Sequence, residues 1–150
     1  MAEPTLSREG NLRFASLPCR GYPADPWAMV AEVKRLLAGQ DIEIYGAVSI
    51  FFSLPVDDLT SCECQVGSAI SGLGRPLGTM MIEDYRQLTA LSLPHAGPVR
   101  ELATTYQRLE AHARAQNRGV RPYWRLALRN QRMADGNVLP AAEASLFLDR

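Results

Sequence analysis

The sequence predicts an α+β fold in which a β-α-β-β unit occurs twice, giving an antiparallel sheet with two helices on one face. Three observations support this prediction. Two segments have the apolar spacing of amphipathic helices, and each is followed by strand-like segments. In addition, a short motif recurs at a constant offset, as Leu17-Pro18-Cys19-Arg20-Gly21 in the first half and Leu93-Pro94-His95-Ala96-Gly97 in the second.

Chain length and charge limit the class of protein. The 150 residues suit one globular domain, and 47% hydrophobic residues are enough for a buried core. Sixteen basic side chains balance sixteen acidic ones, which argues against direct nucleic-acid binding. No apolar run approaches the roughly 18–20 residues of a membrane span, and the polar N-terminus is unlike a secretory signal. We therefore expect a cytoplasmic protein that contacts no membrane.

In the first half we expect a flexible N-terminal tail over residues 1–10 and one β-α-β-β unit over 11–71. Asp25 is a good N-cap and Pro26 suits the first helical position, which predicts a helix over 25–38. The predicted strands are rich in β-branched and aromatic residues or alternate in polarity: Asn11–Leu17, Glu43–Ser53 and Ser61–Ile70. The last two form a predicted hairpin around a turn at Pro55–Thr60.

In the second half, glycine and proline residues over 72–78 predict a linker, after which the same order recurs over 79–150. The predicted elements are strands at Thr79–Glu83 and Gln87–Leu93, a helix at Pro98–Gln116, a strand at Tyr123–Arg129, a polar loop at Asn130–Asn137 and a strand near Ala142–Asp149. The two units then form a single domain over 11–150. Joining their sheets edge to edge hides both inner edges. The face without helices becomes a shallow trough across the join, where a small-molecule site is expected.

The three cysteines favour reduced thiols over a disulfide framework or a metal site. Cys62 and Cys64 share one strand face, and a zinc site would need two further soft ligands. Only Cys19, His95 and His112 are available, at distant positions. We therefore expect neither a metal nor another cofactor.

Alternation along the predicted strands places aromatic rings and a few polar groups in the trough, a composition typical of small-molecule sites. Tyr106 lies on a helical stripe and fits a core position as well. The aromatic residues could instead pack against a covering loop or a homodimer partner, and Arg125 could form an ion pair or anchor an acidic ligand group. The candidate ligand-binding residues are Tyr45, Ser49, Phe51, Glu63, Gln65, Tyr106, Tyr123, Arg125, Glu143 and Phe147.

The second half resembles a known family. The stretch LSLPHAGPVRELATTYQRLEAHA is similar to the signature of the GyrI-like effector-binding domains, with the best agreement at His95, Gly97, Pro98, Glu101, Leu102, Tyr106 and Leu109. The resemblance covers about residues 11–149. It implies a bacterial protein with a tandem β-α-β-β fold and a pocket on the sheet face away from the helices. The family includes drug-sensing domains fused to DNA-binding modules, free-standing gyrase-inhibitory proteins and some hydrolases of reactive natural products. This chain resembles the free-standing form.

The chain departs from that family at two acidic positions. Where many members have E-x-Y after the second helix, this sequence has Arg125 and Ala127, and the final strand lacks the usual acid as well. Both departures weaken the expectation of a cationic ligand, although Glu63 and Glu143 remain available. No nucleophile elbow or phosphate-binding glycine loop is present.

Three functions follow as hypotheses. The first is a sensor or sequestering protein that holds a hydrophobic or aromatic small molecule. The second is a hydrolase in which Glu63 or Glu143 activates water. The third is an inhibitor of a macromolecule such as DNA gyrase.

Overall fold

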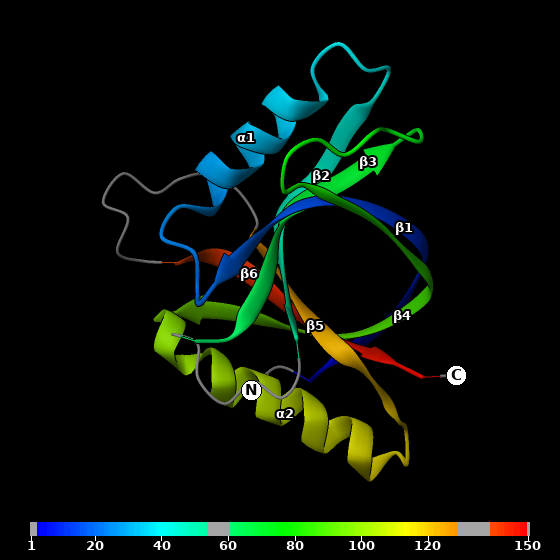
Figure 1. Ribbon diagram of the computed structural model, residues 1–150. Coiled ribbons are helices and arrows are strands. Elements are labelled where there is room, and N and C mark those ends of the chain that lie inside the picture. The colour runs from blue at the N-terminus through cyan, green and yellow to red at the C-terminus, as the bar shows by residue number, and fades with distance from the viewer. Residues whose placement is uncertain (1–2, 54–60, 129–138, 150) are drawn as a thin grey trace.

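The computed structural model describes residues 3–53, 61–128 and 139–149. The order of elements is β-α-β-β twice, and Figure 1 shows the strands arranged in a ring with both helices outside it. The elements are β1 (Thr5–Arg20), α1 (Pro26–Leu37), β2 (Glu43–Ser53), β3 (Glu63–Ser71), β4 (Met81–Gly97), a 3-10 turn at Val99–Glu101, α2 (Leu102–Ala115), β5 (Val120–Leu128) and β6 (Leu139–Leu148). The predicted α+β class with an antiparallel sheet and two helices is confirmed.

The spacing of the elements extends the offset seen in the sequence, which relates Leu17 to Leu93. Three elements of the second half begin at that same offset from their counterparts in the first half: β4 from β1, α2 from α1, and β6 from β3. The start of β5 lies one position further from the start of β2 than this offset. The stretch from Gly72 to Met80 between the two halves contains no helix or strand. The predicted turn at Pro55–Thr60 and the predicted loop at Asn130–Asn137 lie outside the described residues.

The sheet closes on itself, in the order β1-β3-β2-β5-β6-β4 with β4 also paired to β1. The halves meet at two seams. One joins β2 to β5, with Phe51 opposite Arg125. The other joins β1 to β4 over a long antiparallel register from Thr5 opposite Ser92 to Ser16 opposite Met81. The trough that the sequence predicted as an open face is therefore the interior of a closed barrel.

The expected tail over residues 1–10 is wrong from Thr5 onward. Thr5–Gly10 is the first part of β1 and pairs with β4, although its residues are exposed as a whole and only the Glu9 side chain reaches the cavity. Backbone hydrogen bonds to β4 stabilise this polar segment, whose composition alone gives little strand signal. The strand-like segments predicted at 79–83 and 87–93 are likewise one long strand, β4.

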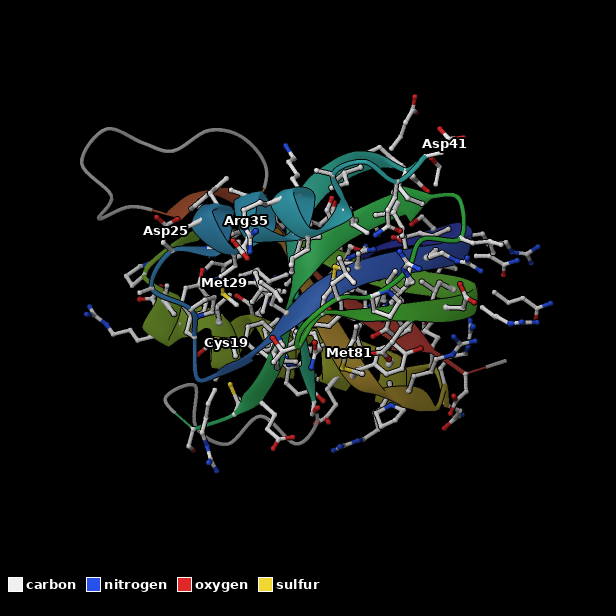
Figure 2. The ribbon with its side chains drawn as sticks, turned by 45° about the horizontal axis from the view of Figure 1, so that its top comes forward. Cys19, Asp25, Met29, Arg35, Asp41 and Met81 are labelled. Atoms are coloured by element: carbon white, nitrogen blue, oxygen red, sulfur yellow. The ribbon has the colours of Figure 1, made fainter. Side chains whose placement is uncertain are left out.

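The first helix begins where its local signals place it, whereas α2 begins at Leu102, after a 3-10 turn, and not at the predicted Pro98. The Asp25 side chain accepts a hydrogen bond from the Ala28 N–H at 3.1 Å and caps α1, at whose start it lies in Figure 2. At the start of α2, the Pro98 carbonyl can only accept, so the His95 Nε2–H donates to it at 3.2 Å. His95 Nδ1 then accepts from the Thr105 hydroxyl at 2.8 Å. Buried His95 thus ties the end of β4 to α2, which is a structural role.

The core lies on both sides of the sheet. The larger cluster packs between α2 and the outer sheet face around Trp124, which stacks on Phe52 with a ring distance of 4.6 Å. Another cluster lies beneath α1 around Val33 and Ile70. A third fills part of the barrel interior and is formed by Phe14, Phe51, Leu88, Ala90 and Phe147, with Leu12, Tyr85 and Tyr123 packed against it. Within the described residues, no helix is long and apolar enough to cross a membrane.

Candidate functional site

A cavity of about 730 Å³ lies in the barrel interior, on the side of the sheet away from the helices. Both halves of the chain contribute to its wall, which is about equally polar and apolar and carries three ionisable side chains. It is lined by Glu9, Leu12, Phe14, Gly46, Ala47, Ser49, Ala69, Arg125, Ala127 and Glu143. Its size and its mixture of apolar and polar groups are typical of small-molecule sites.

Arg125 is the central charged group of this cavity. Its guanidinium donates to both carboxylate oxygens of Glu9, from Nη1 to Oε1 and from Nη2 to Oε2, each at 2.7 Å. Nη2 also donates to the Ser145 hydroxyl at 3.2 Å, and the guanidinium carbon lies 5.1 Å from the centre of the Phe147 ring. Ser145 is further hydrogen-bonded to the Ser92 hydroxyl at 2.7 Å. A polar network therefore links β1 to β5 across the barrel interior and continues through β6 to β4.

Beside the cavity, an aromatic cluster fills the rest of the interior. Phe51 stacks on Tyr85 with a ring distance of 4.6 Å and on Phe147 with a ring distance of 5.9 Å. The ring centre of Tyr123 lies 6.0 Å from that of Phe51, and the ring centre of Phe14 lies 4.7 Å from that of Phe51. Burial, followed by the charge of Glu83, raises the pKa of the Tyr85 phenol well above its ordinary range, so this ring stays neutral. Of these five rings only Phe14 lines the cavity, so Phe14 connects the aromatic cluster with the cavity wall.

The structure brings together three predicted site residues in the cavity wall, namely Ser49, Arg125 and Glu143. Phe51, Tyr123 and Phe147 converge as predicted, but they pack on one another and belong to the interior core. Phe51 and Phe147 are only 3% and 0% exposed.

Tyr45 does not join this group. Its side chain is 52% exposed and lines a separate hollow with Tyr85 and Arg13. The β2–β3 register breaks between Tyr45 and Ser49, and Gly46 has a φ of +82°. Across this shift Tyr45 is opposite Ala69 and Ser49 is opposite Gly67, so Tyr45 keeps the inward face of the strand that alternation gave it. Its ring is nevertheless largely exposed and lines the separate hollow instead of the cavity.

Glu63 and Gln65 lie in another hollow, of about 380 Å³, with Pro18, Cys19 and Arg20. Gln65 accepts a hydrogen bond from the Ser16 hydroxyl at 2.9 Å. Of the two candidate catalytic acids, Glu143 therefore lines the main cavity and Glu63 does not.

Tyr106 is on the opposite side of the sheet. It packs against Trp124 with a ring distance of 5.5 Å, and its hydroxyl donates to Glu110 at 3.1 Å. Burial and the Glu110 charge raise its pKa. The helical stripe that carries Tyr106 is thus core, and its assignment as a ligand-binding residue is not supported by its position.

Three lining residues of β1 were missed by sequence reasoning. Glu9 falls in the segment predicted as a tail, and Leu12 and Phe14 lie in a predicted strand to which no face was assigned. One signal could have found them. The offset between the two halves relates Glu9 to Tyr85 and Phe14 to Ala90, which lie in the second-half strand β4.

The thiols lie at the end of β1 and the start of β3. Cys62 and Cys64 have their sulfurs 3.5 Å apart, and Cys19 is opposite Cys64 in the strand register. Burial raises the pKa of the Cys64 thiol strongly and that of Cys19 less. Among the described residues, no three histidine, cysteine, aspartate or glutamate side chains are grouped in a way that could hold a metal ion.

Comparison with known proteins identifies the fold. No family model matches the sequence, and no curated protein matches it. Among solved structures, the C-terminal domain of EcmrR superposes with a TM-score of 0.77 at 12% identity, covering 99% of this chain and 98% of that domain. EcmrR in a complex with DNA gives a TM-score of 0.79 at 11% identity, and there the match covers 99% of this chain but only 57% of EcmrR.

Two further structures share the fold at lower similarity. A hydrolase from Listeria innocua has a TM-score of 0.61 at 10% identity and covers 98% of this chain and 92% of its own. A protein named SAV2435, bound to tetraphenylphosphonium, has a TM-score of 0.58 at 8% identity, covering 99% of this chain and 94% of its own. These TM-scores show a common fold, which is consistent with the GyrI-like fold that the sequence predicts.

Proposed function

We propose that this protein binds a hydrophobic or aromatic small molecule in the barrel cavity, as a sensor or sequestering protein. The observation that carries the proposal is the 730 Å³ cavity itself, whose wall combines apolar Leu12, Phe14 and several alanines with the charge of Arg125. A ligand that fills it exchanges water for apolar contact, while the polar groups fix its orientation. The ligand-bound structure of SAV2435, which has the same fold, supports small-molecule binding as the class of function.

The test uses a neutral aromatic probe, N-phenyl-1-naphthylamine, whose fluorescence rises in apolar surroundings. We expect saturable binding by the protein and a raised melting temperature. Ala47→Leu adds three carbon atoms to the cavity wall and should weaken binding of the probe. The matched control is Ala31→Leu, the same change at an exposed position of α1. The proposal fails if the probe does not bind, or if both variants affect binding equally.

A hydrolase is the second candidate, because Glu143 lies in the wall of the same cavity and a hydrolase from Listeria innocua shares the fold. In that case Glu143 would activate water as a general base beside the bound substrate. Glu143→Gln should then abolish turnover of a strained or electrophilic substrate while the melting temperature and probe binding stay unchanged. Turnover that survives this substitution would exclude the assigned role of Glu143.

A further inference from the structure

The ion pair between Arg125 and Glu9 lies at the cavity and joins two parts of the chain far apart in sequence. The Arg125 side chain is only 11% exposed and that of Glu9 is 27% exposed. An arginine buried to this degree needs an anion beside it, because an uncompensated charge is costly to remove from water. The cavity therefore contains a position at which a negative group must be present.

Arg125 is the fixed member of the pair. β5 pairs with β2 on one side and with β6 on the other. The guanidinium is held by the Ser145 hydroxyl and by the face of the Phe147 ring, both on β6. Both Nη atoms point at Glu9, and buried Nε has no hydrogen-bond partner among the described residues. The arginine thus stays in place with donor capacity left over.

Glu9 is the member that can leave. The β1–β4 register shifts on both sides of Gly10, whose φ is +72°, so Glu9 lies in a bulge of the strand. Bulges redirect side chains, which accounts for the orientation of this carboxylate toward Arg125. The described pairing of β1 with β3 begins only at Phe14, so near Glu9 the strand pairs with β4 alone. Rotation of one partly exposed side chain would free the guanidinium.

We propose that the Glu9 carboxylate is a built-in occupant of an anion site, and that the ligand is an amphipathic acid whose carboxylate or sulfonate replaces Glu9 on Arg125. This proposal rests on the proposed function and specifies its ligand class. Exchange of one anion for another keeps Arg125 paired, while the apolar part of the ligand fills the cavity. A sulfonate has a third oxygen that the carboxylate of Glu9 lacks. A cationic ligand would have to pair with Glu9 and leave Arg125 without its partner.

Glu143 is the other acidic group in the cavity wall, and it limits where the acid of the ligand can lie. Arg125 is opposite Ser145 in the β5–β6 register, and Ala127 is opposite Glu143. Glu143 is therefore a diagonal neighbour of Arg125 on the same face of the sheet, with their backbone positions about 7–8 Å apart. The acid group must bind at the Glu9 side of the arginine, and a hydrogen-bond donor on the ligand would suit the Glu143 side.

The test compares two probes that share one aromatic skeleton. 8-Anilinonaphthalene-1-sulfonate carries a sulfonate, whereas N-phenyl-1-naphthylamine carries none. Glu9→Gln removes the competing charge, so it should lower the dissociation constant of the sulfonate probe by about tenfold or more. The dissociation constant of the neutral probe should change by less than about twofold. The control is Glu32→Gln, which changes the net charge equally in an exposed i,i+3 pair with Arg35 on α1 and should move neither probe.

The outcomes separate this inference from the proposed function. If the neutral probe binds but Glu9→Gln leaves sulfonate binding unchanged, or strengthens both probes alike, the anion site is refuted and the binding function stands. If neither probe binds to any variant, both are refuted. Tetraphenylphosphonium is the third probe, and weaker binding of this cation to Glu9→Gln than to the unmodified protein would make Glu9 the ligand-binding group and overturn the inference. Arg125→Gln should abolish the gain that Glu9→Gln gives.

Discussion

Among the glycines whose surroundings the structure describes, Gly67 tolerates a side chain least. It lies in β3, opposite Ser16 of β1 and Ser49 of β2. A Cβ at this position would lie 1.8 Å from the carbonyl oxygen of Ala15 and 2.7 Å from the Cα of Ser16. Real Cβ contacts essentially never fall below 3.0 Å, so Gly67→Ala forces β1 and β3 apart. The obstructing atoms belong to the backbone, and no rotamer change can relieve them.

The expected loss of stability follows from that separation. Overpacking in a core costs about 1–3 kcal/mol. Moving β1 away from β3 also weakens adjoining backbone hydrogen bonds, each worth about 1 kcal/mol. The free energy of unfolding should therefore fall by about 3–5 kcal/mol, a large part of the ~5–15 kcal/mol that holds a domain of this kind together.

The assay is urea unfolding followed by tryptophan fluorescence and circular dichroism. The matched control is Gly119→Ala, where the added Cβ meets Asp149 Oδ2 at 2.8 Å. That atom is the end of an exposed side chain and can rotate away, so we expect a loss below about 1 kcal/mol. An equal loss in the two variants would refute the close approach of β1 and β3 that shapes this part of the barrel.

Three further changes test the core, the helix start and the pH dependence. Phe51→Ala should cost about 3–5 kcal/mol in urea unfolding, whereas Tyr45→Ala, at an exposed ring, should cost less than about 0.5 kcal/mol. Asp25→Ala removes the cap of α1 and should lower the free energy of unfolding by about 1 kcal/mol, with a loss of helical circular dichroism on mild heating. Burial raises the pKa of Tyr22 to about 12, so the folded protein keeps a proton that the unfolded chain releases near pH 10. Stability should fall as the pH rises from about 10 toward 12, and Tyr22→Phe should shift the alkaline unfolding midpoint upward without lowering stability at pH 7. A midpoint that does not move would contradict the burial of that hydroxyl.

Elements with strong local signals were predictable from the sequence. The strand predicted at Glu43–Ser53 has those bounds in the structure, because β-branched and aromatic residues fill it. The helix predicted over 25–38 is observed at Pro26–Leu37, where Asp25 and Pro26 define its start within a short stretch of sequence. Such signals need no knowledge of distant contacts.

Closure of the sheet was not predictable in the same way. Thr5–Gly10 is polar and exposed, and its strand conformation depends on β4, which belongs to the other half of the chain. Neither the pairing of Thr5 with Ser92 nor the ion pair from Glu9 to Arg125 leaves a trace in local composition. Long-range backbone pairing therefore decides the element that completes the site.

The candidate site shows the same division. Alternation placed Ser49, Arg125 and Glu143 correctly, because each lies in a regular stretch of strand. Tyr45 is on the same face, opposite Ala69, but it lies beyond the register shift at Gly46 and its ring is largely exposed. Alternation predicts the face of a side chain, whereas a single sequence gives too little information to locate a bulge or to show which inward side chains reach the cavity.

The offset between the halves also shows how corresponding positions came to carry different groups in the barrel interior. Phe51 and Ala127 are related by that offset, and so are Ser49 and Arg125. In the first half the phenylalanine fills the interior as the centre of the aromatic cluster. In the second half the alanine leaves space, and the neighbouring position on the same face carries the charged group. At these two pairs of positions the halves thus place different groups in the interior, and a bound ligand would meet the Phe14 ring from the first half and the Arg125 charge from the second.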